Sequence, residues 1–127
     1  MPKRKDRRPP VAVGHVFFAA TDVAEAARWF ETVGLRPIAS DDDFAVLELR
    51  GGTHLVVTRA ARRPRRGTEA PFDLMVDDVD ATRRKFVAKG LKPSRISRGS
   101  IHDEFSLAGP DGCSMAVLSS HAGHRAV

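Results

Sequence analysis

The chain carries the same series of residues twice at one fixed spacing. Four residue types recur without a gap at an offset of 56 positions (78 − 22), namely Asp22 and Asp78, Phe30 and Phe86, Gly34 and Gly90, and Pro37 and Pro93. Such a registry indicates one supersecondary unit used twice. Each copy reads as an apolar strand, an aspartate that can cap a helix, an amphipathic helix, a Gly-Leu-x-Pro exit and two or three further strands. The repeat therefore predicts an α+β chain built from two βαβββ modules.

Apolar runs and turn residues divide the chain into one domain, expected over residues 11–120, with a short segment at each end. The modules are expected over 11–58 and 70–120, with an arginine-rich linker at 59–69. Helices are predicted over 22–34 and 78–89, and strands over 11–19, 44–50, 53–58, 72–76, 92–98, 102–108 and 113–119. Gly51-Gly52 is predicted as a two-residue hairpin turn. Residues 1–10 are expected to form a disordered basic tail and 121–127 a loose tail.

The composition is that of an ordinary globular domain. Of the 127 residues, 42% are hydrophobic and 29% charged, and no apolar run approaches the roughly 20 residues that cross a membrane. No membrane partner is therefore expected. Cys113 is the only cysteine, so no disulfide can form within the chain. Because the basic start leads into prolines rather than into an apolar signal-peptide core, we expect a cytoplasmic protein.

The net charge of +5 is concentrated in two segments outside the predicted helices and strands. Residues 1–10 contribute +4, and the arginines between positions 59 and 66 contribute +5, which leaves the remainder near −4 (5 − 9). Neither segment contains an aromatic residue on which a base could stack. We therefore expect a solvated tail and a solvated loop, with no nucleic-acid partner; a functional polybasic patch is the alternative.

Three strings of residues carry a family resemblance. They are GHVFF from Gly14 to Phe18, FDLMVDDVD from Phe72 to Asp80, and GPDG from Gly109 to Gly112. With the paired βαβββ unit, they make the chain similar to the vicinal oxygen chelate superfamily, the fold of glyoxalases, bleomycin-resistance proteins and extradiol dioxygenases. The resemblance implies a cupped mixed sheet with the helices on its outer face. It also implies a small-molecule ligand in the cup and a homodimer that completes it.

The same resemblance implies a divalent metal held by the first and last strand of each module. Only His15 matches a family ligand, because Val56, Pro71 and Ala116 stand at the other three positions. Histidines on neighbouring strands, His54 and His102, are the candidate replacements, with Zn, Fe, Mn or Ni as the metal. Hydrogen-bonded or exposed strand residues are the alternative interpretation of the three histidines.

Strand alternation gives an independent estimate of which side chains face the cup, since residues two apart share a face. If His15 faces the cup, so do two candidate proton-transfer residues, Glu48 and Glu104, for which solvated strand positions are the alternative. The candidate ligand-binding residues on this face are Phe17, Phe44, Val56, Asp73 and Met75. A mostly apolar wall with a few polar groups is typical of a small-molecule site.

Two functions fit these residues. The first is a divalent-metal-dependent lyase, isomerase or dioxygenase acting on a small oxygenated organic substrate, with Glu48 or Glu104 moving a proton. The second is a metal-free protein of the bleomycin-resistance type that sequesters a drug or metabolite. Ligand count distinguishes them, because fewer than three groups within about 2.0–2.2 Å of one point leave no tight transition-metal site. A purely structural member of the superfamily is a third interpretation.

Overall fold

The computed structural model describes residues 5–123 and 125–127. Its elements follow one another as β1 (His15–Ala20), α1 (Val23–Thr32), β2 (Arg36–Ser40), β3 (Phe44–Glu48), β4 (His54–Arg59), β5 (Leu74–Val76), α2 (Val79–Ala88), β6 (Glu104–Ala108) and β7 (Ser114–Ser119). Two 3-10 turns, η1 (Arg50–Gly52) and η2 (Pro110–Gly112), connect β3 to β4 and β6 to β7. None of the helices in the described part of the chain is long and apolar enough to cross a membrane.

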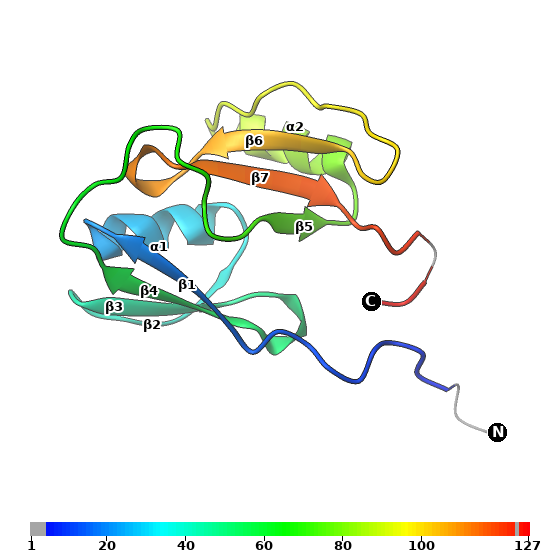
Figure 1. Ribbon diagram of the computed structural model, residues 1–127, viewed down its shortest axis with the longest axis horizontal. Coiled ribbons are helices and arrows are strands. Elements are labelled where there is room, and N and C mark those ends of the chain that lie inside the picture. Colours follow the sequence, from blue (N-terminus) through cyan, green and yellow to red (C-terminus); the bar gives the residue numbers. More distant parts are fainter. Residues whose placement is uncertain (1–4, 124) are drawn as a thin grey trace.

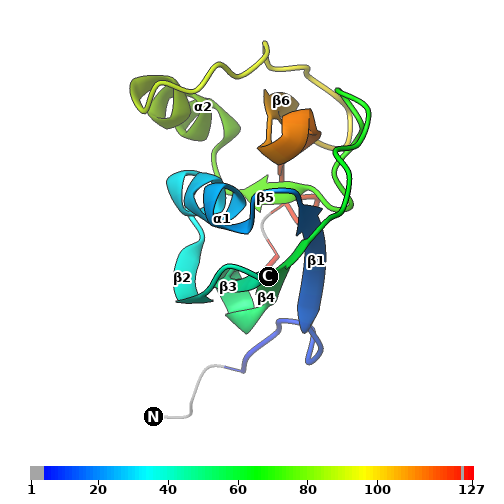
Figure 2. The same ribbon diagram turned by 90° about the vertical axis from the view of Figure 1, so that its left-hand side faces the viewer.

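Each module forms its own mixed sheet, which we call sheet A and sheet B (Figure 1). Sheet A has the strand order β1-β4-β3-β2 and sheet B the order β5-β7-β6. The first strand of each module runs parallel to the last, and the other pairs are antiparallel. Both helices lie on one side of the molecule, with β1 and β6 on the other (Figure 2). The α+β class with two repeated modules is confirmed, and the cupped sheet consists of two separately hydrogen-bonded sheets.

The repeated aspartates begin the two helices as predicted. Asp22 accepts a hydrogen bond from the backbone N–H of Glu25 at 3.0 Å, and Asp78 accepts one from Ala81 at 2.9 Å. Side-chain oxygens at this position satisfy N–H groups that the helix itself leaves unpaired. The aspartate that recurs in the sequence therefore makes the same helix-capping hydrogen bond in both modules.

The core lies between the helices and the sheets and joins both modules. Alternate strand residues such as Phe18, Leu55 and Val57 face it, each at most 5% exposed. Phe30 of α1 is fully buried, packs edge-on against Phe18 and stacks on Phe72 of the second module at a ring distance of 6.1 Å. One continuous cluster of buried residues follows from these contacts.

The structure differs from the predicted elements at three places. The predicted strand over 92–98 is irregular chain with one isolated bridge, between Ser97 and Glu104. Pro93 has no N–H to donate, and Arg83 donates hydrogen bonds to the carbonyls of Pro93 and Ser94, so these groups do not pair with a neighbouring strand. A strand that the sequence did not predict, β2, follows α1. The expected two-residue turn at Gly51 is the turn η1.

The flanking and linking segments were predicted as solvated. Part of the expected basic tail, residues 1–4, lies outside the described residues, as does residue 124 of the expected loose tail. Linker residues are exposed from 61 to 69, yet Gly67 donates a hydrogen bond to the carbonyl of Gly112 at 2.8 Å. The linker is therefore attached to the second module rather than free along its length.

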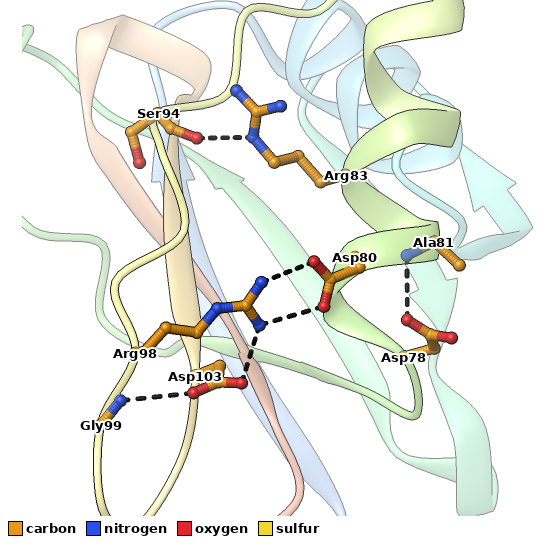
Figure 3. A network of polar contacts seen from close by, with 8 residues as sticks. All are labelled: Asp78, Asp80, Ala81, Arg83, Ser94, Arg98, Gly99 and Asp103. Atoms are coloured by element: carbon orange, nitrogen blue, oxygen red, sulfur yellow. Dashed lines mark hydrogen bonds and ion pairs between the residues drawn. The ribbon is translucent and has the colours of Figure 1, made fainter.

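An ionic network fastens the extended segment before β6 to α2 (Figure 3). Arg98 contacts both carboxylate oxygens of Asp80, at 2.7 and 3.0 Å, and Asp103 at 2.9 Å. Hydrogen bonding from Arg98 lowers the pKa of Asp80. Arg98 and Asp80 are solvent-exposed and Asp103 is partly exposed, so the network orders the segment more than it stabilises the whole fold.

Acid should release this segment. A carboxyl whose pKa is lowered by folding contributes stability that is complete above its unfolded pKa, here 3.8, and is lost as pH falls through the folded pKa. Because intrinsic exchange itself slows in acid, the quantity to follow is the protection factor, and we expect it to decrease for the amides of residues 94–99 below about pH 4. In Asp80→Asn the lower protection of these amides should already be present at pH 7. Asp22→Asn at α1, the helix without this ionic network, serves as the control. Unchanged exchange in Asp80→Asn would contradict the fastening role.

Candidate functional site

One rung of polar residues crosses all four strands of sheet A. The strand register places Arg36 opposite Glu48, Glu48 opposite His54, and His54 opposite His15. Directly paired residues share a face, and their strand neighbours Leu47 and Leu55 are buried on the helix side. The polar rung therefore lies on the face turned away from α1.

The central pair of this rung is hydrogen-bonded. Glu48 Oε1 accepts from Nη2 of Arg36, and Oε2 lies 3.2 Å from Nε2 of His54. The Glu48 side chain is only 19% exposed, whereas that of His54 is 36% exposed. The His15 ring lies edge-on to His54 at 6.1 Å between centroids. A half-buried carboxylate is thus held between a guanidinium and an imidazole, beside a second imidazole.

Apolar residues continue the same face along the strands. The next rung pairs Phe17 with Val56 and Val56 with Val46, and the following one pairs Phe44 with Thr58. Phe17 is 60% and Phe44 43% exposed. Two exposed aromatic rings and two partly exposed valines therefore continue the face that carries the polar rung. Strand parity placed these residues on one face from the sequence, and the register confirms that arrangement.

His102 does not join the other two histidines. It precedes β6 in sheet B and stacks flat on His121, with ring centroids 4.7 Å apart, and its Nδ1 is buried without a hydrogen-bond partner. Among the described residues, no three His, Cys, Asp or Glu side chains gather to hold a metal ion. The expectation of one three-histidine site is therefore not met within this part of the chain, because His102 belongs to the module of sheet B, whereas His15 and His54 lie on neighbouring strands of sheet A.

The remaining candidates belong to sheet B. Met75 pairs with Leu118 and Leu118 with Glu104, so these three residues form a rung of their own. Met75 is 49% exposed, Leu118 is 8% exposed, and Asp73 lies exposed just before β5. Glu104 thus belongs to the rung of Met75 and Leu118 in the second module and not to the hydrogen-bonded rung of Glu48.

Arg36 is the site residue that sequence analysis missed. It lies in β2, which the adjacent proline and the polar residues after it concealed. A register shift between Pro37 and Ala39 lets Arg36 and Ala39 pair with Glu48 and Val46 of the same face. An arginine two residues past a helix-ending glycine was the available signal.

Two other features lie away from this face. A hollow of about 330 Å³ opens at the start of α1 and is lined by Thr21, Asp22, Val23, Ala24, Asp42 and Arg59. The buried Cys113 has a thiol pKa raised by burial, which keeps it protonated and unreactive. Neither feature shares residues with the polar rung.

Comparison with known proteins identifies similar domains. The family model described as "Glyoxalase-like domain" matches residues 15–118. No match was found among curated proteins. Among solved structures, lactoylglutathione lyase from Agrobacterium tumefaciens is similar with a TM-score of 0.70 and 19% identity, covering 90% of this chain and 97% of that one.

Two further solved structures carry the same fold. Bleomycin-binding protein from Streptomyces verticillus, complexed with copper(II)-bleomycin, has a TM-score of 0.65 and 19% identity, covering 89% of this chain and 99% of that one. A glyoxalase/bleomycin resistance protein/dioxygenase from Alicyclobacillus acidocaldarius has a TM-score of 0.69 and 22% identity, covering 88% and 93%. At these identities the likeness establishes the fold and leaves the activity to the site.

Proposed function

The chain belongs to the glyoxalase-like domain family and so to the vicinal oxygen chelate superfamily, and on that premise we propose that it binds a small organic molecule on the open face of sheet A. The observation that carries this proposal is the exposed rings of Phe17 and Phe44, with the partly exposed Val46 and Val56, on the same face as the rung of Glu48 and the two histidines. Exposed apolar surface rimmed by polar groups is typical of a ligand or partner site.

Metal-free binding fits the residues better than a metal enzyme does. His15 and His54 supply two imidazoles, and the described residues add no third ligand to complete a group. Tight transition-metal sites need at least three protein ligands. The described residues of one chain therefore do not fit the divalent metal that the superfamily resemblance implies. Stoichiometric zinc, iron, manganese or nickel in protein purified without added metal would restore the enzyme interpretation.

Phe17 supplies the decisive variant for the ligand face. Because its ring is 60% exposed, Phe17→Ser should leave folding nearly unchanged while removing an aromatic contact with the ligand. Such a contact contributes about 0.5–1.5 kcal/mol. Affinity for 2-naphthol, a two-ring aromatic alcohol used as the probe ligand, should therefore fall roughly two- to tenfold by calorimetry. The matched control is Val87→Ser on α2, which is 50% exposed and distant in the fold. Equal affinity in all three proteins would overturn the assignment of this face.

The homodimer and the cytoplasmic location stay predictions. A second copy is the competing occupant of the same apolar face. If a dimer covers it, light scattering should give twice the monomer mass of 13.9 kDa, and Phe17→Ser should shift that mass toward the monomer value. A dimer unaffected by Phe17→Ser would leave the face available to the small molecule.

A further inference from the structure

Both carboxylate oxygens of Glu48 already have a hydrogen-bond partner within the rung. Oε1 is taken by Arg36 and Oε2 by His54. With 19% of its side chain exposed, Glu48 is enclosed between these partners. A guanidinium beside a carboxylate favours its ionised form. Glu48 therefore acts on its neighbours, and of the two imidazoles in this rung it orients that of His54.

The hydrogen bond from Glu48 selects one tautomer of His54. An ionised carboxylate only accepts hydrogen bonds, so Nε2 of His54 must carry the proton that it donates across 3.2 Å. In neutral imidazole the other nitrogen, Nδ1, is then an acceptor. No described residue donates a hydrogen bond to that Nδ1. The 36% exposed ring thus offers one acceptor to a molecule lying on the face.

The charges of the rung cancel. Arg36 contributes +1 and Glu48 contributes −1, and these two groups are paired with each other. With both imidazoles in their neutral form, His15 and His54 add no charge. Next to this balanced rung the surface is apolar over Phe17 and Val56. Nothing in this arrangement compensates a charged ligand, which would lose its hydration on the apolar part of the face.

Geometry sets the size of the ligand. Successive residues of one face lie about 7 Å apart along a strand, and neighbouring strands about 5 Å apart. A molecule bonded to His54 must therefore extend about 7 Å to lie over Phe17 and Val56 on the next rung. Two fused planar rings have this extent.

We propose that the face of sheet A selects an uncharged planar molecule carrying one hydroxyl or N–H donor, which bonds to Nδ1 of His54, and that Arg36 and Glu48 are positioning residues that fix the acceptor. The inference rests on the proposed function, since it names the ligand class of the same face. It also assigns Glu48 to orientation rather than to proton transfer.

Three probes with one ring system test the selection. The probes are 2-naphthol, 2-methoxynaphthalene, which lacks the donor, and a naphthalene bearing a quaternary ammonium, which carries a charge. At pH 8 we expect 2-naphthol to bind about tenfold tighter than either of the others, because one good hydrogen bond is worth about 1.4 kcal/mol. In His54→Phe the affinity for 2-naphthol should fall to that of the ether, while the affinity for the ether stays unchanged. Equal affinities of the three probes would overturn the selection yet leave the ligand face standing. If no probe binds, the proposed function itself fails.

Arg36→Gln tests the positioning role. It leaves Glu48 uncompensated, so affinity for the cationic probe should rise several-fold and the preference for naphthol should shrink. Arg95→Gln, an exposed arginine of the second module, removes the same charge elsewhere and is the control. In ¹⁵N spectra of the intact protein, His54 should show a protonated Nε2 and an unprotonated Nδ1, and the share of that tautomer should fall in Glu48→Leu. A protonated Nδ1 in the unaltered protein would overturn the positioning role.

Discussion

Phe30→Ala should lower the free energy of unfolding by about 3–5 kcal/mol, the cost of emptying a fully packed aromatic site. Phe30 is 0% exposed and contacts the rings of Phe18, Trp29 and Phe72, with centroids 5.2 to 6.1 Å away. Phe72 belongs to the second module, so the cavity would lie where the two modules meet. Urea denaturation gives the loss, and hydrogen exchange should show that both sheets are destabilised together.

The repeat supplies the matched control for this substitution. Phe86 stands at the equivalent position of the second helix, is 3% exposed and packs edge-on against Phe105 of its own module. Phe86→Ala should cost a similar amount, yet its effect on hydrogen exchange should be concentrated in sheet B. A loss below about 1 kcal/mol for Phe30→Ala would contradict its place at the centre of the core.

Asp111→Ala should lower the free energy of unfolding by about 2–4 kcal/mol. The Asp111 side chain is 5% exposed and accepts hydrogen bonds from the backbone N–H of Thr21, at 2.8 Å, and from its hydroxyl. These bonds tie the β6–β7 turn of the second module to the start of α1 in the first. Loss of the carboxylate would leave buried donors without a partner.

Variants at the same position separate the hydrogen bonds from the backbone conformation. Asp111 has a φ of 58°, which alanine adopts at a cost of about 1–2 kcal/mol and glycine adopts freely. Asp111→Gly should therefore be less destabilising than Asp111→Ala by about that amount. The ion pair of Arg50 and Asp77 is the counterpart that joins the turn η1 of the first module to the start of α2 in the second. Both of its side chains are at least 60% exposed. Asp77→Ala should cost under about 1 kcal/mol, and an equal loss at both positions would contradict the account.

Local patterns in the sequence were sufficient to predict the helices and the face of the site. The caps at Asp22 and Asp78 are set by residues three positions apart, and strand alternation separates Phe17 from the buried Phe18 without knowledge of the rest of the fold. Such features depend on near neighbours in the chain, so a single sequence carries them.

The composition of the polar rung depends on contacts between distant strands. The family pattern placed the metal ligand of the last strand of the first module at position 56, which is Val56, whereas the register places His54 opposite His15. Arg36 enters through a strand that Pro37 concealed, and His102 lies in the module of sheet B, where it stacks on His121. Pairing between strands is fixed by core packing and turn geometry, which one sequence does not reveal.

The central claim, that the open face of sheet A is the ligand site, is tested most directly by following the backbone amide signals of the ¹⁵N-labelled protein during titration with 2-naphthol. Saturable shifts should concentrate on β1, β3 and β4, around Phe17, Val56 and His54. Shifts confined to the hollow at Thr21, Asp42 and Arg59, or no saturable shifts at all, would contradict the account.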